Sequence, residues 1–175
     1  MAISLTSTDT RRVDNSHELF GKDKGLLVIR PGRSACKTWF TIPEGAYALV
    51  TKHGGEIPYE DGNCVWPAGI HYQPPWIKVS HLVTKQSVVF DMPVKGCKTL
   101  DNVSVEIDCA VVFRIMGDAE KGEDPSLVRK FVYEVTPRGL EQQLRDAQEE
   151  AVRALARSVK HTEVYGLRSV GTEAN

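Results

Sequence analysis

Apolar and polar residues alternate along residues 99–116 of the chain. The even positions begin polar, and the odd positions hold seven apolar residues in succession: Val103, Val105, Ile107, Cys109, Val111, Phe113 and Ile115. A period of two residues over this length predicts one long strand with a buried face. From Ala110 onward the even positions become mixed, so we expect a second layer to cover the other face toward the strand's end.

A second β-rich segment, residues 86–99, comes directly before this strand. Asp101 and Asn102 lie between the two segments, and both residue types tolerate the positive φ of tight turns. The pattern therefore predicts a β-hairpin with its tip near residues 100–102. Pro93 cannot donate a backbone hydrogen bond, so the first strand should be bent, bulged or at an edge there.

Short apolar runs separated by Pro and Gly precede the hairpin. They predict strands at residues 26–30, 39–42, 46–51 and 77–83. The segment between the last two runs is dense in Gly and Pro and holds only short strands. Its aromatic residues should pack it onto the sheet: Tyr59, Trp66, Tyr72 and Trp76.

The period changes after Met116. Asp124-Pro125 and Thr136-Pro137 each place a capping residue before a proline, which is a typical start of a helix. The first helix should bury Leu127, Val128, Phe131, Val132 and Val135. The second helix should pack through one apolar stripe formed by Leu140, Leu144, Ala147, Ala151, Leu155 and Val159.

Together these elements predict an α+β fold, with a mixed, mostly antiparallel β-sheet and C-terminal helices packed on it. We expect a polar N-terminal arm over residues 1–24 that adds little to the core. One domain should span residues 25–167. Residues 168–175 should form a C-terminal tail, which is also a candidate truncation point.

Charge and cysteine content narrow the functional classes. The formal net charge of −1, from 22 basic and 23 acidic residues, argues against a nucleic-acid partner. The four cysteines form no close pair and follow no signal peptide, so we expect reduced thiols in an intracellular protein. No apolar run approaches the roughly 18 residues of a membrane-spanning helix, so any membrane contact should be peripheral, lipid-mediated or made by sequence outside this chain.

Four segments in order resemble the stomatin, prohibitin and flotillin superfamily, the SPFH or band-seven domain. Residues 42–50 (IPEGAYALV) are similar to its opening strand, and residues 67–75 (PAGIHYQPP) to its Pro-Gly-hydrophobic-His segment. Residues 99–105 (TLDNVSV) resemble its T-x-D-x-V-x-V hairpin, followed by residues 112–115 (VFRI). Residues 140–153 resemble its long helix, and the likeness extends over residues 42–167.

This resemblance, which covers stomatin-like and prohibitin homology domains, implies a non-enzymatic oligomeric scaffold that organises a membrane microdomain or a large protein assembly. Its partners would be copies of itself or related subunits. The protein would be intracellular and associate peripherally with a membrane surface, or, as the alternative, be cytosolic. Family members commonly begin with a membrane-embedded segment and continue into a long coiled coil. This chain has a polar arm at its start and ends at Asn175, so we expect either a fragment or a different mode of assembly.

Two chemical candidates draw on the same residues: Cys64, Cys97, His53, His71 and His81. Either cysteine with any one of these histidines would define a Cys-dependent hydrolase, and Cys64, His71, His81 and Cys97 together would define a zinc site. Neither has a supporting local spacing, so we expect no catalytic residue, no metal and no cofactor. His71 should be structural, half-buried and bonded to a backbone carbonyl or a carboxylate.

Binding candidates rest on the second helix, whose first half is mainly acidic and whose second half is basic. This helix either covers the core or also forms a subunit interface, in which the acidic half of one copy meets the basic half of the next. The candidate interface residues are Glu141, Arg145, Glu149, Arg153 and Arg157. Cys36, beside Trp39 and Phe40, is a candidate acylation site similar to those of flotillins.

A monomeric protein-binding module within a larger complex is the alternative to a scaffold. Its contact surface would be the polar arm together with the aromatic-rich residues 59–76.

Overall fold

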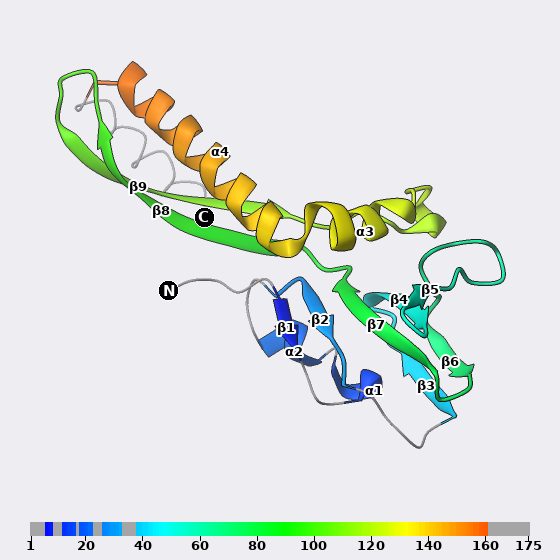
Figure 1. The fold of residues 1–175 in the computed structure, drawn as a ribbon. Helices are drawn as coiled ribbons and strands as arrows, with labels where there is room; N and C mark the ends of the chain where they lie inside the picture. Colours follow the sequence, from blue (N-terminus) through cyan, green and yellow to red (C-terminus); the bar gives the residue numbers. More distant parts are fainter. Residues whose placement is uncertain (1–5, 9–11, 17, 23–25, 33–37, 161–175) are drawn as a thin grey trace. The chain divides into compact units, whose positions relative to one another are not determined.

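The computed structural model describes residues 6–8, 12–16, 18–22, 26–32 and 38–160 (Figure 1). The chain divides into two compact units, and each is described by itself. The first unit comprises Met1–Val89 and Val112–Glu141, and the second comprises Phe90–Val111 and Gln142–Asn175.

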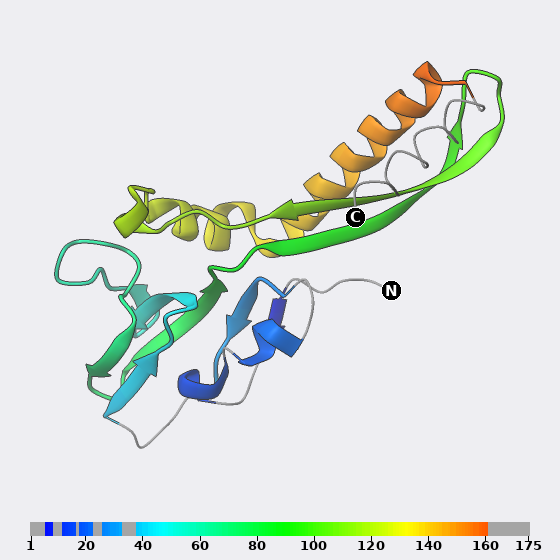
Figure 2. The same cartoon turned by 180° about the vertical axis from the view of Figure 1, so that it is seen from behind.

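A five-stranded sheet forms the centre of the first unit (Figure 2). Its strands, in spatial order, are β1 (Thr6–Thr8), β2 (Val28–Arg30), β7 (Ile77–Thr84), β4 (Ala46–Lys52) and β5 (Gly55–Glu56). Only β1 and β2 pair in parallel; the other neighbours are antiparallel. The mixed, mostly antiparallel sheet expected from the sequence is therefore confirmed.

The apolar run of β4 is explained by two cores, one on each face of the strand. Tyr47 and Leu49 belong to a cluster with Leu27, Val28 and Val83. The alternating residues belong to a second cluster: Ala46, Ala48 and Val50. Because both faces are covered, the strand is buried nearly throughout and shows no polar alternation.

A two-stranded sheet of β3 (Trp39–Ile42) and β6 (Gly69–Tyr72) lies apart from these five strands in the pairing order. Two short helices precede it, α1 (Val13–Ser16) and α2 (Glu18–Lys22). Val13 is buried in the second cluster, where Leu19 and Phe20 also pack. The expectation that the first residues add little to the core is wrong for these three side chains.

The chain after β9 (Ser104–Phe113) forms one 3₁₀ turn, η1 (Ala119–Lys121), and then helix α3 (Ser126–Lys130). Helix α3 continues as a π-helical turn, η2 (Phe131–Val135). Asp124 caps α3 by accepting hydrogen bonds from Ser126 N and Oγ at 2.9 and 2.6 Å. The predicted helix start is confirmed. Of its five expected core residues, Val128, Phe131 and Val132 are buried, whereas Leu127 and Val135 lie at the surface.

The second unit is built from the hairpin of β8 (Val88–Lys98) and β9 together with helix α4 (Pro137–Ser158). The first two residues of β8, the last two of β9 and the first five of α4 belong to the first unit. Asn102 has a φ of 60° at the hairpin tip, as predicted. The odd residues of β9 are half-buried and the even ones exposed, which confirms its inward face. Gly96, with a φ of 72°, shifts the alternation of β8 so that Val94 and Cys97 are both buried.

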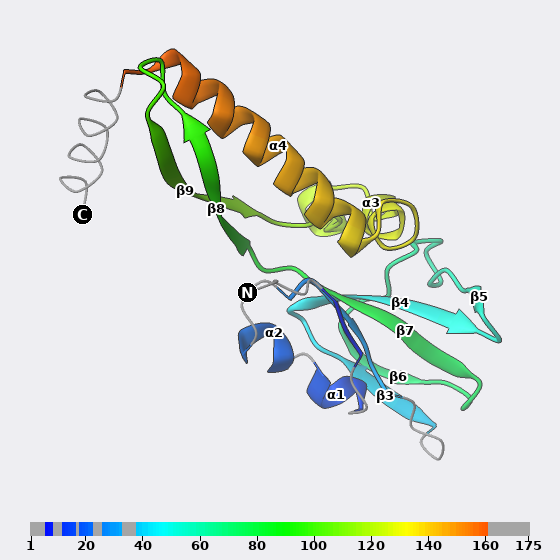
Figure 3. The ribbon, with the colours of Figure 1, turned by 60° about the vertical axis from the view of Figure 1, so that its left-hand side comes forward.

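Two expectations about these elements are wrong. The even face of β9 is not covered toward its end, since Val112 is 64% exposed, as is Met116 just beyond it at 52%. Helix α4 lies along the hairpin (Figure 3), but its buried residues are Gln148, Val152 and Ala156. Three members of the predicted stripe, Ala147, Ala151 and Leu155, are exposed instead. At 100° per residue the stripe lies roughly a quarter turn away from the buried face.

Candidate interaction site

Helix α4 begins and ends on defined local contacts. Thr136 Oγ1 accepts a hydrogen bond from Gly139 N at 3.2 Å, so Thr136 acts as the predicted N-cap before Pro137. Near the other end, Leu100 N at the hairpin tip donates to Val159 O at 3.2 Å. This bond gives a carbonyl near the C-terminal end of the helix a partner and ties that end to the hairpin.

An apolar stripe runs along the exposed side of α4. Leu155 is 52% exposed, Ala147 and Ala151 are exposed, and Leu144 is half-buried. These residues follow one another at spacings of three and four, so they share one face of the helix. The hairpin contacts a different face, through Val152 and Ala156.

The five predicted interface residues are spaced four apart on α4, so they wind slowly around it. Glu141, Arg145 and Glu149 are half-buried, whereas Arg153 and Arg157 are exposed. The structure brings Arg153 and Glu149 together, with Arg153 Nη2 2.8 Å from Glu149 Oε2. An exposed pair of this kind is worth about 0.5 kcal/mol, so it can readily exchange partners.

Gln148 is a residue that the sequence analysis missed. It is 6% exposed on the face of α4 toward the hairpin, and its Nε2 donates to Cys109 O at 2.6 Å and Met92 O at 3.4 Å. Its Oε1 is buried and has no hydrogen-bond partner among the residues that the structure describes. The amide thus connects the helix to both strands. The sequence offered only a weak signal for the burial of Gln148. It is a polar residue between exposed Ala147 and half-buried Glu149, and the apolar stripe was expected to form the buried face of the helix.

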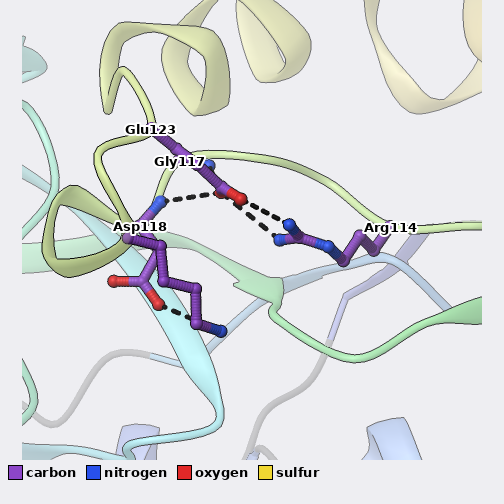
Figure 4. A network of polar contacts seen from close by, with 5 residues as sticks. Arg114, Gly117, Asp118 and Glu123 are labelled. Atoms are coloured by element: carbon purple, nitrogen blue, oxygen red, sulfur yellow. Dashed lines mark hydrogen bonds and ion pairs between the residues drawn. The ribbon is translucent and has the colours of Figure 1, made fainter.

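In the first unit, Arg114 and Glu123 hold the loop that follows β9 (Figure 4). The guanidinium of Arg114 donates to both carboxylate oxygens of Glu123. Glu123 Oε2 also accepts hydrogen bonds from Gly117 N at 2.8 Å and Asp118 N at 3.2 Å. Lys121 Nζ lies 3.5 Å from Asp118 Oδ2. Arg114, noted only as part of a family-like motif, therefore closes this loop.

These contacts and local burial shift several pKa values, among them that of Arg114, which the hydrogen bond to Glu123 raises. The hydrogen bonds from Arg114, and then those from Gly117 and Asp118, lower the pKa of Glu123 to about 2. Burial, followed by the nearby carboxylates of Asp118 and Glu123, raises the pKa of Tyr47. The carboxylate of Glu123 is thus ionised at neutral pH, which suits a structural clamp.

His71 has the structural role that the sequence predicts. It is half-buried, and its Nε2 lies 2.9 Å from Pro67 O. The ring packs among Phe40, Tyr59 and Trp66, with centroids 5.2 to 5.9 Å apart. Its ring nitrogen is therefore engaged by the backbone within an aromatic cluster.

The remaining chemical candidates stay apart in the described residues. Cys97 is buried and its Sγ lies 3.9 Å from Val94 O, and neither Cys64 nor Cys109 hydrogen-bonds to a histidine among them. No group of three or more His, Cys, Asp or Glu side chains gathers there in a way that could hold a metal. Cys36, the candidate acylation site, lies outside the described residues.

Within the ranges that the structure describes, no helix is both long and apolar enough to cross a bilayer.

Comparison with known protein families gives a match over most of the chain. The sequence model described as SPFH domain / Band 7 family matches residues 40–173. Curated protein sequences gave no match. The matched range begins within β3 and contains β4 to β9 and both C-terminal helices, α3 and α4.

Proposed function

Because the chain belongs to the SPFH domain / Band 7 family, we propose that it is a non-enzymatic scaffold whose copies, or related subunits, associate through helix α4. Domains of this family generally form oligomers and are generally non-enzymatic. The assembly would organise a membrane microdomain or a large protein complex, with the domain at the membrane surface in the first case.

The exposed apolar stripe of α4 is the observation that carries this proposal. Leu155, Ala151 and Ala147 leave apolar surface in water on a helix that is already packed on its hairpin through another face. Burial of apolar area contributes about 25 cal/mol per Å², so a second copy that covers residues 147–155 of the stripe gains free energy. Small residues such as Ala147 and Ala151 also permit close approach of a neighbouring backbone.

Charge supplies the orientation of the contact. Along α4, the acidic residues Asp146, Glu149 and Glu150 come before Arg153 and Arg157, and Arg138 and Arg145 lie on the acidic side of this order. A head-to-tail neighbour would therefore meet opposite charge along the edge of the stripe. Because Glu149 and Arg153 already pair within one chain, an intermolecular pair would replace an existing one of similar strength.

The test is charge reversal at Arg153 and Arg157. The double variant Arg153→Glu/Arg157→Glu should weaken self-association, measured by sedimentation over a concentration series, more than it lowers the free energy of unfolding. The matched control is Lys52→Glu/Lys130→Glu, which reverses two exposed lysines of the first unit. Unchanged assembly in the α4 variant would remove these arginines from the interface.

Vesicle flotation separates the two settings of the scaffold. Flotation of the assembled protein would support a membrane microdomain. Assembly without flotation would support a large complex formed away from a bilayer.

A monomeric binding module is the second candidate, and the β3–β6 sheet favours it. Ile70 is 61% and Tyr72 77% exposed, and Trp39 lies opposite Tyr72 in the pairing. These three side chains share one face, since residues two apart point the same way and paired residues lie side by side. If a partner protein binds this face, Ile70→Glu should abolish the binding and Leu155→Glu should leave it unchanged.

A further inference from the structure

A pocket of about 440 Å³ opens in the first unit beside β2, β3 and β7. Its volume falls in the range of small-molecule sites. The residues that line it come from separate parts of the chain: Arg12 and Asp14 beside and within α1, Arg30 at the end of β2, and Lys78 and His81 in β7. The fold thus gathers charged groups that the sequence keeps far apart.

Three cations face this pocket without a partner of opposite charge. Among the described residues, Arg12, Arg30 and Lys78 form no ion pair. Among the described lining residues, Asp14 is the single acidic side chain, and its Oδ1 accepts a hydrogen bond from Thr41 N at 3.0 Å. Within this described lining, three cations against one carboxylate leave an excess of two positive charges.

A chain of hydrogen bonds positions Arg30. Arg30 Nε donates to His81 Nε2 at 3.1 Å, and His81 Nδ1 lies 3.1 Å from Ser80 Oγ. Ser80 Oγ donates to Leu49 O at 3.0 Å, so the hydroxyl oxygen accepts the Nδ1 proton and fixes the imidazole tautomer. Burial, and then the charge of Arg30, lower the pKa of His81 to about 4. The imidazole is therefore a neutral acceptor at physiological pH.

This arrangement leaves the terminal nitrogens of Arg30 available to a ligand. A guanidinium held through Nε by a neutral acceptor keeps its charge and its Nη donors, whereas a carboxylate partner would neutralise it. Arg12 and Lys78 are exposed, so water can hydrate their charges at little cost before a ligand binds.

Apolar residues form the rest of the lining. Trp39, Phe40 and Ile77 are among them, together with Val13 and Pro75. Small-molecule sites commonly combine a mostly apolar wall with a few convergent polar groups that fix the ligand's orientation. The pocket therefore suits a molecule with an anionic head and an apolar body.

We propose that this pocket binds an organic phosphate monoester, with the phosphate held by Arg30, Arg12 and Lys78 and the apolar part against Trp39 and Phe40. A monoester carries −1.5 to −2 charges at pH 7, which matches the excess of two positive charges. Its three terminal oxygens suit two guanidinium groups and an ammonium group. The site is distinct from the α4 surface and does not depend on self-association.

Phenyl phosphate is the probe for this site. Titrated into the ¹⁵N-labelled full chain, it should give saturable shifts of amide signals in β2, β3 and β7. Arg30→Gln should weaken binding about tenfold, since it removes a charge-assisted contact of roughly 1.4 kcal/mol. Arg12→Gln and Lys78→Gln should each weaken it several-fold, and phenol, which lacks the phosphate, should not bind.

Lys52→Gln is the matched control, because Lys52 is an exposed lysine of β4 outside the pocket lining. Its binding should equal that of the wild type. The proposal is overturned if phenyl phosphate gives no saturable shifts up to about 10 mM, or if Lys52→Gln weakens binding as much as Arg30→Gln. Should Arg30→Gln fail to fold, Lys78→Gln serves the same purpose, since Lys78 is exposed.

Vesicles identify the source of the phosphate. Arg30-dependent flotation with phosphatidylcholine vesicles that contain phosphatidic acid, and not with phosphatidylcholine alone, would assign the site to a lipid head group. Phenyl phosphate binding without such flotation would assign it to a soluble phosphate ester.

Discussion

Gly117 lies where the loop after β9 passes closest to the core of the first unit. A Cβ at this position would lie 2.2 Å from Val128 Cγ2, and Val128 is fully buried. Gly117 N also donates to Glu123 Oε2, so the backbone there cannot move away without loosening the Arg114–Glu123 clamp. Close packing therefore requires a residue without a side chain at position 117.

Gly117→Ala should lower the free energy of unfolding by about 1–3 kcal/mol, the usual cost of overpacking a core. Gly45→Ala is the control, because a Cβ there meets nothing within 4 Å. Urea denaturation measures both. Equal stability of the two variants would show that the loop after β9 adapts freely.

His81 predicts a pH dependence of stability. Its pKa in the folded protein, about 4, lies below the ordinary value of 6.5, so the unfolded chain binds the proton more readily. Stability should therefore fall as the pH drops from about 6.5 to 4, by up to about 3 kcal/mol from this residue. In His81→Gln this part of the dependence of unfolding free energy on pH, measured by urea denaturation at a series of pH values, should disappear. A slope that persists unchanged would assign the effect to other groups.

Among the elements, α4 and its hairpin form a packed unit with a polar residue at its centre. Val152 and Ala156 pack against Val94 and Cys97, and Gln148 donates to the backbone of both strands. A donor at this place satisfies carbonyl oxygens that the apolar neighbours cannot reach. The amide also specifies which face of α4 lies on the hairpin.

Gln148→Glu should destabilise the second unit strongly, because it replaces the Nε2 donor with a carboxylate oxygen close to Cys109 O. The cost at pH 8 should exceed about 2 kcal/mol. It should shrink as the pH falls, since the buried carboxyl has a raised pKa and can donate once protonated. Amide hydrogen exchange in β8 and β9 reports the change.

Gln143→Glu, at an exposed position of the same helix, is the isosteric control and should leave exchange in the hairpin unchanged. If Gln148→Glu behaves in the same way, the amide does not connect helix and hairpin.

Most elements could be predicted from the sequence, because their signals are local. The two-residue period gave β9, Asp101-Asn102 the hairpin tip, and Thr136-Pro137 the start of α4. The face on which α4 packs could not be predicted this way. Apolar character marked residues such as Leu155 as buried, whereas the geometry of the hairpin selects Gln148, Val152 and Ala156. Periodicity shows that a helix has an apolar stripe, but not what covers it.

The candidate sites were predictable to a smaller extent. The charge separation along α4 is a local pattern that could be seen in the sequence. The role of this helix as an interface remains a prediction. The pocket around Arg30 was not visible, because its cations come from residues 12, 30 and 78 and meet only through the pairing of β2 with β7 and the packing of α1. Arg114 was noticed as part of a motif, but its partner Glu123 lies nine residues away across a loop.

At the scale of the whole molecule, the account is that an SPFH domain / Band 7 family protein uses two surfaces for two tasks. We propose that the exposed stripe of α4 joins copies and that the cationic pocket of the first unit binds a phosphate ester. Neither task requires a chemical step at any residue. The domain boundaries proposed at residues 24 and 167 fall outside the described ranges and remain predictions.

The most direct test of the central claim is the molar mass in solution, measured by light scattering, of the wild type, Leu155→Glu and Ile70→Glu. The two substitutions place the same charge at similarly exposed apolar positions, 52% and 61% exposed. The account predicts an assembly of many protomers for the wild type and Ile70→Glu, and a much smaller mass for Leu155→Glu. A monomeric wild type, or an assembly that Leu155→Glu leaves intact, would contradict it.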